Sequence, residues 1–148
     1  MAASSPSAPV APAKRSSRIK AWVRASRPHS QANIALPIAL GVAAAMGTGA
    51  PLESWMLWAC AAFSVIDQLF IVFANDYADR ETDARNATFA RFSGGSRVLP
   101  EGRLTASALR GAALVVLGLL GALSGALAVF AGRPWLPVLA AAAAVLVW

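Results

Sequence analysis

Long apolar stretches dominate the pattern of this chain, and its charged residues lie in short regions between them. A helix that crosses a hydrocarbon core of about 30 Å needs roughly 20 apolar residues. Three stretches meet this requirement, at 30–50, 51–74 and 111–131. A fourth, 134–148, would extend only about 22 Å as a helix, so we expect it to be incomplete. The pattern predicts an all-α, polytopic transmembrane helical bundle with about four membrane helices of a larger bundle, the last of them truncated.

The composition divides the chain into three parts. Of its 148 residues, 57% are apolar and 14% are charged. Residues 1–13 carry no charge and are mostly Ala, Ser, Pro and Val, so we expect a disordered tail. Residues 14–29 mix six basic residues with Trp22 and other apolar residues, which predicts a basic interfacial segment on anionic headgroups. Residues 30–148 form the membrane domain, and the single cysteine, Cys60, excludes a disulfide within the chain.

The positions of Lys and Arg predict the orientation. Six basic residues precede the first apolar stretch, and six more lie between the second and the third. The other two links contain only Arg133. Because basic loops remain on the cytoplasmic side, we expect a multi-pass protein of the cell membrane whose N-terminus and residues 75–110 are cytoplasmic.

Glycines recur along the third apolar stretch. Gly111, Gly118, Gly125 and Gly132 are spaced by seven residues, and Gly121 forms a small-xxx-small pair with Gly125. Such a stripe lets a neighbouring backbone approach closely in a membrane. We therefore expect the third helix to pack through its glycine face.

An acidic motif follows the second apolar stretch. If the helix continues, Asp76, Asp79 and Asp83 lie within about 60° of arc, and Asn75 shares a face with the last two. Mg²⁺ takes one or two carboxylates and completes its shell with water and phosphate oxygens. The motif predicts a Mg²⁺ site for a phosphorylated substrate. The alternative is a solvated helix end whose aspartates pair with Arg80 and Arg85.

The loop after this motif contains Gly94, Gly95, Ser96 and Arg97 in succession. Two glycines permit a tight turn that presents backbone N–H groups, and the guanidinium beside them would bind an anion. An ordinary loop has the same composition. Beside a carboxylate cluster, however, the turn predicts that Mg²⁺ and Arg97 bind one diphosphate from two sides.

The motif at 75–83 and the Gly-Gly-Ser-Arg-Val-Leu-Pro-Glu-Gly loop at 94–102 resemble the UbiA superfamily of intramembrane prenyltransferases. Gln68, seven residues before the motif, and the Asn-Asp-Tyr opening resemble most the MenA type, which prenylates 1,4-dihydroxy-2-naphthoate. Arg27 followed by Pro28 also fits this resemblance, which covers roughly residues 24–148.

The resemblance implies Mg²⁺-dependent ionisation of an allylic prenyl diphosphate, and attack on the resulting cation by an aromatic or quinone-precursor acceptor. By position, Asn75, Asp76, Asp79 and Asp83 would hold the metal and the diphosphate, and Arg97 would assist the leaving group. Gln68 would contact substrate. The family has a second Asp-rich motif, which is absent here, so we expect this chain alone to be inactive without a C-terminal half or a complementary chain. We expect no nucleic-acid partner.

Two other functions remain open. A CDP-alcohol phosphotransferase also uses Mg²⁺ and aspartates at a membrane surface, although Arg80 stands here where that family has glycine. A non-catalytic membrane helical module, with a purely structural acidic cluster, is the second alternative.

Overall fold

The computed structural model describes residues 15–49, 51–85 and 95–147, and every element in these ranges is a helix. The elements are α1 (Arg15–Ala25), the 3-10 helix η1 (Pro28–Gln31), α2 (Ala32–Gly47), α3 (Ser54–Ala78), α4 (Arg80–Arg85), α5 (Ala106–Phe130) and α6 (Leu136–Val147). The predicted all-α helical class is confirmed. The predicted tail at 1–13 lies outside the described residues.

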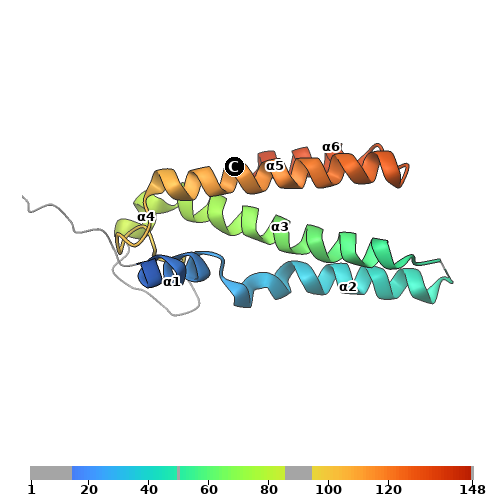
Figure 1. The fold of residues 1–148 in the computed structure, drawn as a ribbon, viewed down its shortest axis with the longest axis horizontal. Coiled ribbons are helices and arrows are strands. Elements are labelled where there is room, and N and C mark those ends of the chain that lie inside the picture. Colours follow the sequence, from blue (N-terminus) through green and yellow to red (C-terminus); the bar gives the residue numbers. More distant parts are fainter. Residues whose placement is uncertain (1–14, 50, 86–94, 148) are drawn as a thin grey trace, which may run out of the picture.

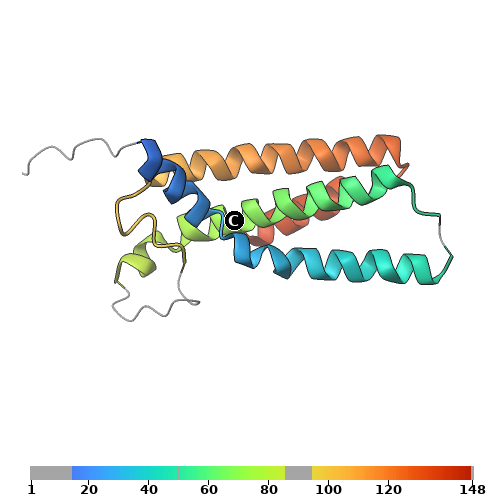
Figure 2. The same ribbon diagram turned by 60° about the horizontal axis from the view of Figure 1, so that its bottom comes forward.

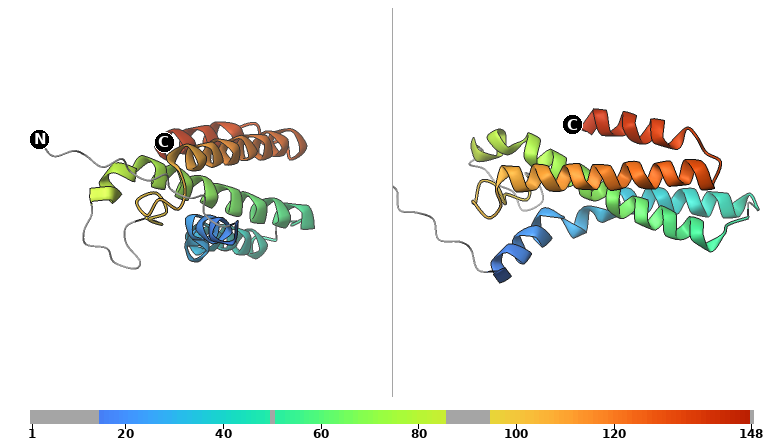
Figure 3. Two further views of the ribbon diagram at one scale, coloured as in Figure 1. Left: turned by 60° about the vertical axis from the view of Figure 1, so that its left-hand side comes forward. Right: turned by 45° about the horizontal axis from the view of Figure 1, so that its top comes forward.

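The helix α3 lies at the centre of the molecule. It packs against α2 on one side and α5 on the other, and the three run lengthwise beside one another (Figure 1). The last helix, α6, folds back along α5, as Figure 3 shows from the top. The links α2–α3 and α5–α6 share one end, whereas α1, α4 and the segment before α5 share the other (Figure 2). The two ends differ in charge, since the basic regions described by the structure lie together at the second end.

The buried core lies at this charged end. Trp22 of α1 packs edge-on against Phe73 of α3, with ring centroids 5.8 Å apart. The buried apolar side chains around this pair come from α1, α3, α5 and the segment before α5: Ala21, Ala25, Phe70, Val72, Phe73, Ala74, Val98, Leu104, Leu109, Ala113 and Val116. Two parts of the chain that are distant in the sequence, α1 and the continuous stretch from Val98 into α5, are therefore held together around the C-terminal end of α3.

Most of the long apolar helices remain exposed. No residue of α2 is buried, and Leu40 is 72% exposed. Trp58 and Phe130, on α3 and α5, are 77% and 84% exposed. Helices that are apolar on their outer faces suit lipid or other helices, not water.

Three helical segments of the described chain are long and apolar enough to cross a membrane: Ser17–Gly47, Ser54–Ala78 and Ala106–Phe130. The first joins α1, η1 and α2, with a break near Arg27, where the backbone adopts a left-handed conformation. The second extends past the predicted boundary and includes Asn75 and Asp76. The spans thus lie where the apolar pattern predicts them, with shifted boundaries.

The expected glycine face of α5 is not used for packing within the described residues. A Cβ atom added at Gly111, Gly118, Gly121 or Gly125 would meet no atom within 4 Å. The helix packs instead through Leu109, Ala113, Val116, Leu120 and Ser124. The described helices therefore pack through this stripe, and the expected contact through the glycine face is not among their contacts.

Candidate functional site

The acidic motif lies on a helix that breaks within it. The regular helix α3 ends at Ala78, and the amide of Asp79 still donates to the carbonyl of Asn75 at 2.8 Å. Asp79 itself leaves the helical conformation, and α4 then begins at Arg80. The helix is therefore interrupted at one residue of the motif, although the amide of Asp83 donates back to the carbonyl of Asp79 at 2.8 Å.

This break gives the three aspartates different surroundings. Asp76 faces the core and is 4% exposed, Asp79 is exposed, and Asp83 is partly buried. Within the described chain, the Asp79 carboxylate has no hydrogen-bond or ion-pair partner. The carboxylates therefore do not form the uniform row that an ideal helix predicts.

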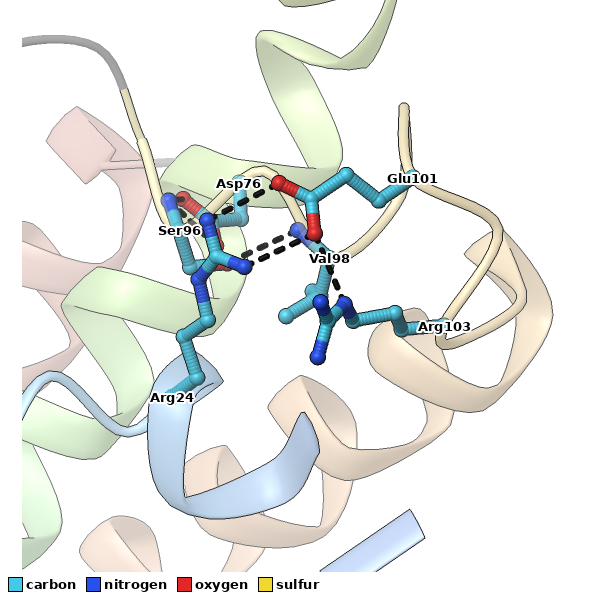
Figure 4. Close-up of polar contacts among 6 residues, drawn as sticks. All are labelled: Arg24, Asp76, Ser96, Val98, Glu101 and Arg103. Carbon is cyan, nitrogen blue, oxygen red and sulfur yellow. Dashed lines mark hydrogen bonds and ion pairs between the residues drawn. The ribbon is translucent and has the colours of Figure 1, made fainter. Parts of the chain in front are cut away.

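Asp76 is bound on both of its oxygens. The Arg27 guanidinium donates to Oδ1, the Ser96 hydroxyl donates to Oδ2, and the Ser96 amide lies 3.3 Å from both oxygens. Figure 4 shows Asp76 beside Ser96. Buried carboxylates require such partners, because an unpaired buried charge is strongly unfavourable. In this structure the Ser96 amide therefore binds the carboxylate of Asp76, which takes the place of an external anion.

Arg27 is held in place by a polar chain that begins inside α3. The amide of Gln68, which is buried, donates to the Ser30 hydroxyl at 2.8 Å, and this hydroxyl donates to the Arg27 carbonyl at 2.8 Å. The Ser30 amide also donates to that carbonyl, at 2.9 Å. These bonds support the left-handed backbone of Arg27 (φ 43°), a conformation that is unfavourable for a residue with a side chain. Gln68 and Ser30 thus fix the position from which Arg27 reaches Asp76.

The Gly95–Arg97 turn lies against Asp83. Gly95 and Arg97 both have positive φ (69° and 57°), and a Cβ on Gly95 would overlap the Asp83 carboxylate and lie 3.3 Å from Nη2 of Arg27. Glycine is required here both for its backbone conformation and for this close approach. Gly94, the other glycine of the predicted turn, lies outside the described residues.

Burial raises the pKa of Asp83, and the negative charges of Asp76 and Asp79 raise it further. The positive charges of Arg27 and Arg97 act in the opposite direction but do not cancel this effect. The ionised form of Asp83 is therefore disfavoured, and an additional cation beside it would favour that form. Arg97 lies near enough to Asp83 to lower its pKa, and its predicted role in diphosphate binding stays a prediction.

A second ion-pair network holds the segment before α5. Arg24 of α1 donates to both oxygens of Glu101, at 2.7 and 2.9 Å, and Nε of Arg103 donates to one of them at 2.7 Å (Figure 4). Partial burial alone would raise the pKa of Glu101, but the hydrogen bonds and charges of Arg24 and Arg103 lower it. The two networks together connect α1 to the turn and to the end of α3.

The alternative pairing of the aspartates with Arg80 and Arg85 is not found among the described residues. Arg80 contacts Glu81 at 3.4 Å, donates to the Tyr77 carbonyl and lies over the Tyr77 ring. Asp76 pairs with Arg27, 49 residues away in the sequence. Proximity in the sequence does not decide this pairing, because the link between α1 and η1 brings the guanidinium of Arg27 to the buried carboxylate.

Some candidate residues already have partners, and others remain open. Asn75 and Asp79 are exposed, whereas Asp76 and Gln68 bind other parts of the chain. Among the described residues, no three His, Cys, Asp or Glu side chains are grouped to hold a metal ion. A Mg²⁺ ion needs only one or two protein carboxylates when phosphate and water supply the rest, and Asp79 and Asp83 could supply these two.

Arg27 is the site residue that the motif alone does not identify. Its Nε is buried, with no hydrogen-bond partner in the part of the chain that the structure describes. The only signal for it in the sequence is its position, directly before Pro28 at the start of the first span. A buried donor without a partner is unfavourable by itself.

An apolar groove of about 490 Å³ runs between α2 and α3. It extends from Gln31 and Ser64, which hydrogen-bond to each other at 3.0 Å, to Met46 and Leu57 near the far end. The lining between them is almost entirely aliphatic. A groove of this kind fits an extended apolar chain better than a polar ligand.

Comparison of the sequence with protein-family models and with curated proteins, and of the fold with solved structures, finds no match.

Proposed function

We propose that this chain is part of a Mg²⁺-dependent membrane enzyme that transfers an isoprenyl group from an allylic prenyl diphosphate to an aromatic or quinone-precursor acceptor. The observation that carries the proposal is the meeting of carboxylates and guanidiniums from three distant segments at the end of an apolar helix. Asp76 and Asp83 come from α3 and α4, Arg27 precedes η1, and Arg97 follows the Gly95–Ser96 turn.

Mixed charge of this kind suits a metal-bound diphosphate. Asp79 and Asp83, with the amide oxygen of Asn75, would hold Mg²⁺, which would neutralise the diphosphate oxygens as the leaving group departs. Arg97 would donate to the same diphosphate, and the positive charge of Arg27 lies close by. Asp76 holds the turn and Arg27 in place, so its role becomes one of positioning.

The surroundings support the same chemistry. The apolar groove between α2 and α3 is a fitting place for an isoprenyl chain whose diphosphate lies at the charged end. Apolar walls also exclude water, which would otherwise capture an allylic cation.

The test measures binding of an allylic prenyl diphosphate to the purified chain in nanodiscs, with Mg²⁺ and with chelator. Asp79→Asn and Asp83→Asn are each expected to weaken Mg²⁺-dependent binding by about tenfold or more, because each removes a charged ligand. Glu81→Gln is the matched control, since it removes the same charge from an exposed neighbour on α4.

Binding that is unchanged by chelator, or equally weakened in all three variants, would contradict the metal role. The acidic cluster would then be structural, as in a non-catalytic helical module. The extensive bonding of Asp76 to Arg27 and Ser96 is the observation that favours that second function.

A further inference from the structure

A second groove, of about 360 Å³, lies between α1 and η1. Its lining combines apolar and basic side chains: Ile19, Lys20, Val23, Arg24, Arg27, Pro28 and His29. It contains none of the carboxylates of the candidate site. Its apolar and basic lining therefore differs from the mixed acidic and basic lining of the candidate site.

The apolar part of the groove is open. Ile19 and Val23 stand one helical turn apart on α1 and are 61% and 55% exposed. On the same helix, Ala21 and Ala25 are buried against the core, so α1 already has a packed face. Two branched apolar side chains on its open face make a small apolar surface next to a basic one.

The basic part of the groove keeps one cation available. Arg24 binds Glu101 and Arg27 binds Asp76, so these two guanidiniums are neutralised within the chain. Lys20 is exposed and has no acidic partner among the described residues. His29 is exposed at the other edge, where a ring N–H can donate a hydrogen bond. No Asp or Glu occurs anywhere in residues 15–31.

The groove lies directly before the N-terminal end of the apolar helix α2. Pro28 and His29 form the turn that leads directly into α2, which is apolar and unburied over its whole length. If the three apolar segments cross a bilayer, the groove lies at the level of the lipid headgroups. At that level an apolar wall faces acyl chains and a cation faces phosphates.

We propose that this groove binds one anionic phospholipid, with its phosphate at Lys20 and His29 and the upper part of an acyl chain along Ile19 and Val23. This goes beyond a helix that rests loosely on a charged surface, because it defines a site with one occupant. The residues that would contact the lipid, Lys20, His29, Ile19 and Val23, have no role in the proposed prenyl transfer.

The test is native mass spectrometry of the full chain in detergent, titrated with phosphatidylglycerol or with phosphatidylcholine of the same acyl chains. The unmodified chain is expected to retain phosphatidylglycerol more tightly. Lys20→Gln should weaken that binding about fivefold, which is the contribution of one cation near an anionic headgroup, and leave phosphatidylcholine unchanged. Ile19→Ser should weaken the binding of both lipids.

Arg85→Gln is the matched control, because it removes one exposed cation at the same end of the molecule but outside the groove. It should leave the binding of both lipids unchanged. His29→Ala provides a second variant, with an expected loss in the same direction as Lys20→Gln. Circular dichroism of each variant establishes that the helices are retained.

Three results would overturn the proposal. Equal affinity of the unmodified chain for the two lipids would remove the headgroup preference, and an equal loss in Arg85→Gln would show diffuse attraction without a site. Displacement of the lipid by glycerol phosphate at a similar concentration would show that the groove takes a free phosphate and not a membrane lipid.

Discussion

At the scale of single residues, the site depends on one close approach. Gly95 lies so near Asp83 that no side chain fits between them, and its φ is positive. Asp83 in turn has a raised pKa, because it is partly buried and stands near Asp76 and Asp79. The Asp83 carboxylate can therefore occupy its position only because residue 95 has no Cβ atom.

Gly95→Ala is expected to displace the Asp83 carboxylate. Gly102→Ala provides a matched control, because the φ of Gly102 is also positive (63°) but an added Cβ atom there would meet no other atom within 4 Å. Both substitutions should destabilise the fold by about 1 kcal/mol through the left-handed backbone. Only Gly95→Ala should also reduce Mg²⁺-dependent diphosphate binding, measured beside the thermal unfolding midpoint of each variant. Equal binding by the two variants would contradict a role for the Asp83 position.

At the scale of the elements, α1 determines how the charged end is assembled. It contributes Ala21 and Ala25 to the core and Trp22 to the contact with Phe73, and it presents Arg24 to Glu101. The sequence predicted a basic interfacial segment here, and the structure adds that it is helical and has a packed face that connects it to α3. Interfacial location itself stays a prediction.

The pairing of Arg24 with Glu101 should weaken at acid pH. The folded state lowers the pKa of Glu101 below its ordinary value of 4.5, so the stabilisation is present above that value and is lost as the pH falls through the lowered pKa. Both side chains are about one-third exposed, which limits the effect to about 1 kcal/mol or less.

The measurement is the unfolding midpoint of the unmodified chain and of Glu101→Gln between pH 7 and pH 3. The difference between them should be present at pH 7 and shrink toward the acid end. Glu81→Gln should show no such difference, because Glu81 is far more exposed (72% of its side chain) and its contact with Arg80 is longer, at 3.4 Å. A difference for Glu101→Gln that stays constant with pH would contradict the ion pair.

At the scale of the whole molecule, charge separates the two ends of the bundle. The basic segments and the acidic motif lie at one end, and the links α2–α3 and α5–α6 lie at the other (Figure 1). This separation agrees with the alternation of basic and non-basic links along the sequence, and the placement of the basic end in the cytoplasm stays a prediction.

Labelling of engineered cysteines would test this arrangement. In a Cys60→Ala background, Arg85→Cys and Gly49→Cys place one thiol at each end of the bundle. A membrane-impermeant maleimide added to sealed inverted vesicles should label the cysteine at 85 and not the one at 49, and the reverse is expected in spheroplasts. Labelling of both thiols from one side would contradict two crossings between the basic regions.

The sequence alone determined the class, the approximate spans and the place where charge gathers, because these depend on local hydropathy and on spacing along one chain. Tertiary structure alone decided that Asp76 is buried while Asp79 stays open, and that the partner of Asp76 is Arg27 and not a neighbouring arginine. It also decided that α5 packs through its aliphatic stripe and leaves its glycines open. The physical reason is the same in each case. Which side chains meet depends on how α1 and α5 pack across α3, and the residue pattern of a single helix does not determine that packing.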